Sequence, residues 1–215
     1  MKGDAIVALL DPALERLRAS RDELRDLDAA LGDGDLGITV GKGCDAVRSQ
    51  LADLTDPAPA QVIRTAGMAF AGANPSTMAA LVGGGLLAGA KAIANAGDLT
   101  REDAVRFARA VADSIALKGK AEPGDKTILD ALIPSVEVLE KSDGDNSETL
   151  TAMVDAARRA VEETAALQSR RGRASWMGER SCGHPDPGAI AYLRFLEALA
   201  EQWELRRSPR ARSSP

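Results

Sequence analysis

The stretch EDAVRFARAVADSIAL, residues 102–117, decides the fold class. Its apolar residues Val105, Ala108, Ala112 and Ile115 recur at steps of three and four, and charged residues stand between them. This spacing brings the four side chains onto one face of an α-helix. The stretch therefore predicts an amphipathic helix with one face buried in a core.

Two later stretches repeat this pattern. They are residues 149–167, with an apolar face through Met153, Ala157 and Val161, and residues 189–203, with a face through Ile190 and Leu193. No segment shows the residue-by-residue alternation typical of strands. Aromatic residues are only 3% of the chain, so the core must consist of small aliphatic side chains that let helices approach closely. We predict an all-α fold, a bundle or barrel of helices.

The totals indicate one soluble domain. The chain has 215 residues, of which 45% are hydrophobic and 27% charged. We predict a helical domain over residues 1–205 and a disordered basic tail, RRSPRARSSP, over residues 206–215. A net charge of −5 argues against a nucleic-acid-binding surface.

Other classes are excluded by missing features. No apolar run is long enough to cross a membrane, and the N-terminal residues lack the apolar segment of a signal peptide. Cys44, Cys182 and His184 are too few for a tetrahedral zinc site without carboxylate ligands. Two cysteines fit a protein of the reducing cytoplasm, where they would remain thiols. We therefore expect a cytoplasmic protein.

An aspartate-rich turn is the first candidate site. The segment LDAALGDGDLG, residues 27–37, places Asp28, Asp33 and Asp35 within eight positions, and its glycines let the turn fold back on itself. Three carboxylates that converge repel one another unless cations lie between them, and Mg²⁺ prefers such oxygen ligands. A helix that starts near Gly37 would point its free amides at an anion there. An ordinary acidic turn between two helices explains the same residues.

A second loop, GKAEPGDKT at residues 119–127, resembles a P-loop only superficially. No strand precedes it, and Asp125 interrupts the motif. We interpret Asp125 as the cap of a helix that begins near Lys126. Lys120 and Lys126 are cations that could meet phosphate, although solvated loop lysines explain them as well.

The third loop, GRASWMGERSCGHPDPG, spans residues 172–188. Arg173 suits phosphate, because a guanidinium can donate two parallel hydrogen bonds to its oxygens. We expect His184 to fix the loop by hydrogen bonds rather than to act in catalysis, since no nucleophile is evident nearby. Trp176 either lies in the core, which is the default, or covers a base.

Taken together and in order, three segments closely resemble the nucleotide-binding L subunit of dihydroxyacetone kinase. They are LDAALGDGDLG (27–37), GKAEPGDKTILDALIPSVE (119–137) and QSRRGRASWMGERSCGHPDPGA (168–189). The same unit forms the C-terminal domain of single-chain dihydroxyacetone kinases, and the resemblance covers roughly residues 5–205. It implies a barrel of antiparallel helices with the nucleotide held by the loops at one end.

The resemblance also implies the ligands of the site. It assigns two Mg²⁺ ions to Asp28, Asp33 and Asp35, and these ions in turn hold the phosphates of ADP or ATP. The residues that it implies for nucleotide binding are Leu36, Gly37, Ile38, Thr39, Ser76, Thr77, Met78, Gly119, Ile128, Arg173, Asp186, Pro187 and Gly188. It assigns no catalytic residue to this chain.

The family further implies that the unit acts with a partner. A separate K-type subunit holds the keto sugar, and in one mode a phosphotransferase-system phosphohistidine carrier rephosphorylates bound ADP, whereas in the other mode ATP is used and exchanged. Two departures leave the mode and the sugar open: Leu36 stands where the family commonly has His, and ANPSTMAAL (73–81) replaces a Gly-Gly-x-Ser-Gly loop. A homodimer also remains open.

Two functions of different classes remain. One is the nucleotide-binding, phosphoryl-transferring half of a kinase for dihydroxyacetone or another short ketose. The other is a nucleotide-loaded binding module that regulates a transcription factor or another protein. Both need the same site, so the residues alone do not separate them.

Overall fold

Helices make up most of the described part of the chain. The computed structural model describes residues 1–208, and within that range it contains no strand. The helices are α1 (Gly3–Ala19), α2 (Arg21–Leu31), α3 (Leu36–Ala52), α4 (Pro59–Ala73), α5 (Thr77–Ala92), α6 (Arg101–Gly119), α7 (Ile128–Lys141), α8 (Asn146–Thr164), the 3₁₀ helix η1 (Arg173–Ser181) and α9 (Pro187–Arg207). The prediction of an all-α fold is confirmed.

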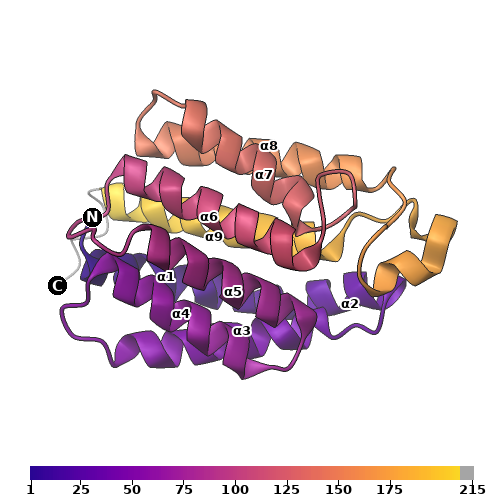
Figure 1. Cartoon of the computed structure of the whole chain (residues 1–215), viewed down its shortest axis with the longest axis horizontal. Helices are drawn as coiled ribbons and strands as arrows, with labels where there is room; N and C mark the ends of the chain where they lie inside the picture. The colour runs from indigo at the N-terminus through magenta and orange to yellow at the C-terminus, as the bar shows by residue number, and fades with distance from the viewer. Residues whose placement is uncertain (209–215) are drawn as a thin grey trace.

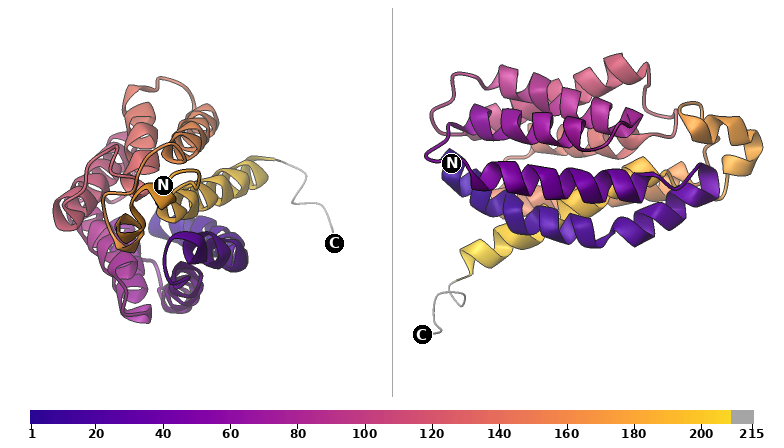
Figure 2. Two further views of the ribbon diagram at one scale, coloured as in Figure 1. Left: turned by 90° about the vertical axis from the view of Figure 1, so that its right-hand side faces the viewer. Right: turned by 90° about the horizontal axis from the view of Figure 1, so that it is seen from below.

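The helices close into a ring. From α3 to α9 each α-helix contacts the next one along the chain, and α1 contacts both α3 and α9. Neighbours in the ring run in opposite directions, and the view along the helices shows their arrangement around a common centre (Figures 1 and 2). The architecture is therefore the expected barrel of antiparallel helices, with α2 packed at one end against α3, α9 and η1.

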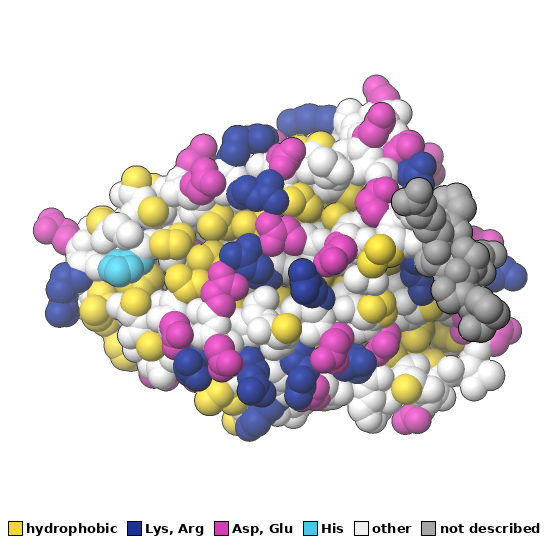
Figure 3. All heavy atoms as spheres, turned by 180° about the vertical axis from the view of Figure 1, so that it is seen from behind, with side chains coloured by type: hydrophobic (Ala, Val, Ile, Leu, Met, Phe, Trp, Pro, Cys, Tyr) yellow, Lys and Arg dark blue, Asp and Glu magenta, His cyan; other side chains and the backbone are white. Residues whose placement is uncertain are grey.

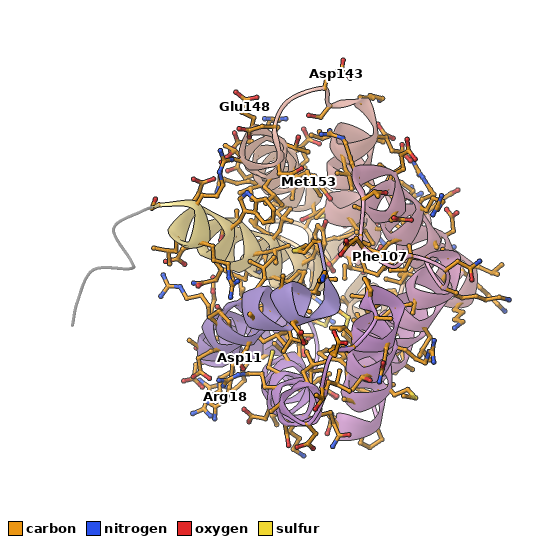
Figure 4. The ribbon with its side chains drawn as sticks, turned by 90° about the vertical axis from the view of Figure 1, so that its left-hand side faces the viewer. Asp11, Arg18, Phe107, Asp143, Glu148 and Met153 are labelled. Carbon is orange, nitrogen blue, oxygen red and sulfur yellow. The ribbon has the colours of Figure 1, made fainter. Side chains whose placement is uncertain are left out.

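The periodic positions of α8 and α9 face the core, as predicted, whereas in α6 Ala112 and Ile115 are buried and Val105 and Ala108 are half-buried. Met153, Ala157 and Val161 of α8 are at most 7% exposed, and Ile190 of α9 is 6% exposed. Figure 4, which looks onto the end opposite the aspartate turn, shows the labelled Met153 among the helices, while Asp143 lies at the periphery.

Small residues set the spacing between helices. A Cβ built on Gly83 of α5 would lie 2.6 Å from the Cβ of Ala71 on α4, and one built on Gly89 would lie 2.4 Å from the ring of Phe107 on α6. Real side chains cannot occupy such positions without shifting the helices. The glycines of α5 therefore allow it to pack closely between α4 and α6.

Alternating helix direction gathers four connections at one end of the barrel. These are residues 32–35, 74–76, 120–127 and 165–186, and they lie at the right of Figure 1, while the N-terminus lies at the other end. The N-terminal helical segment breaks at Ser20 into α1 and α2, and α2 turns to lie against α3.

The outer surface carries charges of both signs. Figure 3 shows acidic and basic side chains interspersed on the face seen from behind, and ion pairs such as Arg194 with Glu23 and Arg158 with Glu197 link neighbouring helices. Among the described residues, no helix is long and apolar enough to cross a membrane. Helix α9 continues through Arg207, and residues 209–215 of the predicted basic tail lie outside the described part of the chain.

Candidate nucleotide and metal site

The three aspartates of the turn converge in space. Asp28 lies in the last turn of α2, and Asp33 and Asp35 lie in the connection to α3. One carboxylate oxygen from each lies within 4.8 Å of the other two. The fold therefore brings together the residues that the sequence placed in a metal site.

Glycines make this convergence possible. A Cβ on Gly37 would lie 2.1 Å from the carbonyl oxygen of Arg21, so only glycine lets the start of α3 pack this closely against α2. Gly34 has a φ of +75°, in the left-handed region that glycine adopts without strain. The turn can thus reverse direction between Asp33 and Asp35.

The three carboxylates of the cluster repel one another. Burial of the Asp35 carboxyl, together with the negative charge of Asp28, raises the pKa of Asp35. Arg173 supplies a positive charge: Nη1 donates to Asp33 Oδ2, and Nη2 donates to Asp35 Oδ1 over 2.8 Å. A guanidinium among these carboxylates shows that the site accommodates a cation, and the oxygen ligands are those that Mg²⁺ prefers. The donor set therefore fits a divalent metal.

The first residue of α3 contributes its backbone rather than its side chain. Leu36 donates its amide hydrogen to Asp28 Oδ2 over 3.1 Å, while its side chain is 5% exposed and packs in the core. Gly37 is buried, and Ile38 is 52% exposed at the same end. Leu36, which stands where the resemblance implies a histidine, is thus an aliphatic core residue.

A hydrogen-bonded chain joins α3 to the start of α5. Thr39 Oγ1 donates to Ser76 Oγ over 3.2 Å and accepts a hydrogen bond from Asn74 Nδ2 over 2.9 Å. Ser76 is the N-cap of α5, since its Oγ accepts from Ala79 N, and such caps contribute about 1 kcal/mol. Thr77 stands exposed at the first turn of α5.

Five more residues that the resemblance implies for nucleotide binding meet beside the start of α5. A Cβ built on Gly188 would lie 3.0 Å from Met78 Cε, 3.0 Å from Asp186 Oδ2 and 3.6 Å from the backbone nitrogen of Ile128. Asp186 caps α9 through Ala189 N, and Pro187 is the first residue of that helix. The starts of α5, α7 and α9 thus surround one point.

Gly119 is the last residue of α6 and lies near α5. A Cβ on Gly119 would contact the methyl groups of Leu81 at 3.7 and 3.8 Å. Each predicted site residue therefore lies at the same end of the barrel: at the end of α2 or in the turn after it, at or just before the starts of α3, α5, α7 and α9, at the end of α6, or in η1.

Arg173 is carried by the arginine loop, which we define as residues 165–183. Its two limbs are joined at the base, where Gly183 N donates to Ala165 O over 2.8 Å and Ser169 N donates to Ser181 Oγ over 2.9 Å. Gly172 and Gly178 have positive φ values of 63° and 58° and bound the segment that contains Arg173. The loop crosses the end of the barrel and reaches the aspartates of the α2–α3 turn (Figure 2).

Four local expectations were wrong. Trp176, for which a core position was the default interpretation, is 82% exposed. His184 is exposed, and its side chain makes no hydrogen bond among the described residues, so it does not fix the loop. Asp125 does not cap a helix that begins near Lys126: α7 begins at Ile128, Asp125 is buried, and Lys126 is buried rather than solvated.

The true cap was readable in the sequence. Thr127 and Asp130 form a capping box at the start of α7: Thr127 accepts from the helix backbone, and Asp130 Oδ2 accepts from Thr127 N over 2.6 Å. A threonine followed three residues later by an acidic residue is a known start signal of helices. The burial of Asp125 and Lys126 has no such local signal, because it depends on the arginine loop that folds over them.

Comparison with known proteins identifies relatives over most of the chain. The sequence pattern of the DAK2 domain matches residues 30–201. The PEP-dependent dihydroxyacetone kinase, ADP-binding subunit DhaL, of Escherichia coli K12 is 34% identical over 180 residues, which are 82% of this chain and 86% of that subunit. The L-erythrulose 1-kinase of Mycolicibacterium smegmatis is 34% identical over 91% of this chain, but this chain spans only 35% of that protein.

A solved structure shares the fold. The crystal structure of the dihydroxyacetone kinase from C. freundii in complex with AMP-PNP and Mg²⁺ superposes with a TM-score of 0.74. The match covers 94% of this chain and 34% of that one, at 23% sequence identity.

Proposed function

The chain belongs to the DAK2 domain family, and from this premise we propose that it is the nucleotide-binding, phosphoryl-transferring subunit of a kinase for dihydroxyacetone or a related short ketose. It is homologous to ADP-binding DhaL subunits over most of its length. The observation that carries the proposal is the meeting of Asp28, Asp33 and Asp35 with Arg173 beside the start of α3. Carboxylates, a guanidinium and helix N-termini together suit a metal-bound polyphosphate.

Each part of the site has a role in this proposal. Asp28, Asp33 and Asp35 hold Mg²⁺, which when bound neutralises phosphate charge and orients the phosphates. Backbone amides at the starts of α3 and α5 donate to phosphate oxygens, and Arg173 turns from the carboxylates to the phosphates. Met78 and Ile128 offer apolar contacts to the adenine.

The remaining residues complete the pocket. Gly188 gives the nucleotide room, because any Cβ there would crowd Met78 Cε. Asp186 and Pro187 hold the start of α9 in place. Gly119 and Thr77 line the rim from α6 and α5. A K-type subunit holds the sugar and docks at the loop-bearing end of the barrel; the similarity to DhaL subunits supports this part of the proposal.

The first experiment tests nucleotide binding. We expect the purified chain to bind ADP or ATP in the presence of Mg²⁺, as measured by isothermal titration calorimetry. Asp33→Ala abolishes that binding, while Asp26→Ala, which removes an exposed aspartate of α2 paired with Arg25, leaves it intact. Both variants should keep the helical circular-dichroism spectrum. Equal nucleotide affinity in Asp33→Ala and the intact chain contradicts the site assignment.

The second experiment tests phosphoryl transfer. The chain is mixed with a K-type subunit and dihydroxyacetone or erythrulose, with either ATP or a phosphohistidine carrier as the donor. Product formed only with the carrier indicates that ADP stays bound as a cofactor, and product formed with ATP indicates exchange. Nucleotide binding without turnover in any combination favours the regulatory binding module instead.

A further inference from the structure

Lys126 is a lysine with almost no access to solvent. The residue is 1% exposed, and its Nζ donates hydrogen bonds to the carbonyl oxygens of Leu167 over 2.9 Å and Ser181 over 2.6 Å. Its φ of +61° is in the left-handed region, which costs a residue with a Cβ free energy. Burying an ammonium against neutral carbonyls is also costly, and this desolvation lowers the pKa of Lys126. The surrounding fold must hold this residue in place.

The two carbonyls lie on opposite limbs of the arginine loop. Leu167 precedes Arg173 and Ser181 follows it, so one ammonium joins both limbs near the base. The hydrogen bond from Ser169 N to Ser181 Oγ joins the limbs beside it. The base is therefore fixed, while the segment between Gly172 and Gly178 carries Arg173 outward.

Asp125 provides a second attachment next to the first. Its carbonyl oxygen accepts from Arg170 N over 3.0 Å, and its Oδ2 accepts from Arg171 Nε over 2.8 Å. Although burial acts to raise it, the hydrogen bond and charge of Arg171 hold the pKa of Asp125 below its usual value. Asp125 and Lys126 together hold residues 167–171 and 181, which are the base of the loop.

The same dipeptide leads directly into the pocket. Thr127 follows it and caps α7, whose first residue is Ile128. The residues that hold the arginine loop are thus continuous with the helix start that faces Met78 and Gly188. A lysine held in this way does not face a phosphate, because it is 1% exposed and two of its three N–H donors bond the carbonyls of Leu167 and Ser181.

We propose that Lys126 is a positioning residue for Arg173: its ammonium fixes the base of the arginine loop and so sets the guanidinium at the aspartate cluster. This role rests on the proposed function, since it matters only where Arg173 meets a nucleotide. Lys126 acts through the loop and makes no contact with the ligand.

The test is a double-mutant cycle on Mg-ADP affinity. Lys126→Met keeps the length of the side chain and removes its donors. We expect it to weaken Mg-ADP binding by about tenfold, in the range for loss of charged hydrogen bonds. In an Arg173→Ala background we expect no further loss, because the group that Lys126 positions is already gone. A loss of the same size in both backgrounds overturns the proposal, since a general effect on folding persists without Arg173.

Amide hydrogen exchange measures, without any ligand, whether Lys126 holds the base of the arginine loop. In Lys126→Met the amides of Ser169, Arg170 and Gly183 should exchange about tenfold faster, while those in the middle of α4 and α8 stay unchanged. Unchanged exchange in the arginine loop overturns the proposal. This measurement also separates two failures: a chain that binds no nucleotide refutes the proposed function, whereas loop exchange still decides whether Lys126 holds the loop.

A second variant covers the case in which Lys126→Met does not fold. Arg171→Leu removes one attachment to Asp125 from a side chain that is 46% exposed, while Arg170 Nη1 stays 3.9 Å from Asp125 Oδ1 and keeps a positive charge beside the buried carboxylate. We expect the same changes at smaller size, about threefold in affinity, again absent in the Arg173→Ala background. Wild-type affinity and exchange in Arg171→Leu overturn the proposal.

Discussion

Replacing Arg173 with alanine should move two affinities in opposite directions. In the structure the guanidinium lies on Asp33 and Asp35, two of the three carboxylates proposed to hold Mg²⁺. A metal ion that binds by itself must displace this guanidinium. A metal–nucleotide complex also displaces it but gives it phosphate oxygens in return. The variant therefore favours the bare metal and disfavours the complex.

The magnitudes follow from exposure. The side chains of Arg173, Asp33 and Asp35 are 43%, 49% and 35% exposed, so each ion pair contributes at most about 1 kcal/mol. With screening by salt we take about 1 kcal/mol for the two together, which corresponds to roughly fivefold tighter binding of the bare metal in Arg173→Ala. Loss of charged hydrogen bonds to phosphate costs about 1.5–3 kcal/mol, which makes Mg-ADP binding roughly ten- to a hundredfold weaker.

Mn²⁺ can stand in for Mg²⁺ in the first measurement, because free Mn²⁺ is counted by electron paramagnetic resonance during a titration. Isothermal titration calorimetry with ADP and saturating Mg²⁺ gives the second affinity. Arg180→Ala is the control, since Arg180 is an exposed arginine of the same loop with no ion pair among the described residues. Metal affinity that falls or stays level in Arg173→Ala, or an unchanged affinity for Mg-ADP, refutes the reasoning.

Three further outcomes test the fold and the pocket. Gly43→Ala would place a Cβ 2.4 Å from the ring of Phe70 and should lower the free energy of unfolding by about 1–3 kcal/mol in urea titrations, whereas Gly72→Ala, with nothing within 4 Å, should be neutral or slightly stabilising. Gly188→Ala would put a Cβ 3.0 Å from the Asp186 carboxylate and should weaken Mg-ADP binding with little change in the melting temperature; a lower melting temperature with unchanged Mg-ADP affinity would contradict the pocket. Burial raises the pKa of Asp186 from 3.8 to about 7, so between those values the unfolded chain releases a proton that the folded chain keeps, and stability should fall as pH rises. Asp186→Asn keeps the helix cap and should make stability fall less steeply with pH. Melting temperatures measured from pH 4 to pH 7 test this, and an equal decline in the variant and the intact chain would contradict it.

Local physics made much of the fold predictable. The three- and four-residue spacing in α6, α8 and α9 determines which face of each helix is buried, because helix geometry alone fixes which side chains share a face. The few aromatic residues and many small ones indicated closely packed helices, and Gly83 and Gly89 show that packing at α5. The grouping of Asp28, Asp33 and Asp35 was also readable, since the three lie within eight positions and the glycines between them let the turn fold back.

Contacts between distant segments could not be read from local sequence. Lys126 looks like a solvated loop residue until the arginine loop, some 40 positions later, folds over it and supplies the carbonyls of Leu167 and Ser181. Trp176, by contrast, has the large apolar side chain typical of a core residue, but no other segment of the described chain covers it.

The sequence by itself thus determined the helices, the antiparallel barrel expected from its family, and the aspartate turn, because these depend on residues close together in the chain or on long matching motifs. The tertiary structure alone decided that Arg173 meets Asp33 and Asp35 across about 140 positions, and that Asp125 and Lys126 hold the loop that carries it. The physical reason is that burial and ion pairing depend on which groups the fold brings together, and no local pattern encodes the distance between two loops.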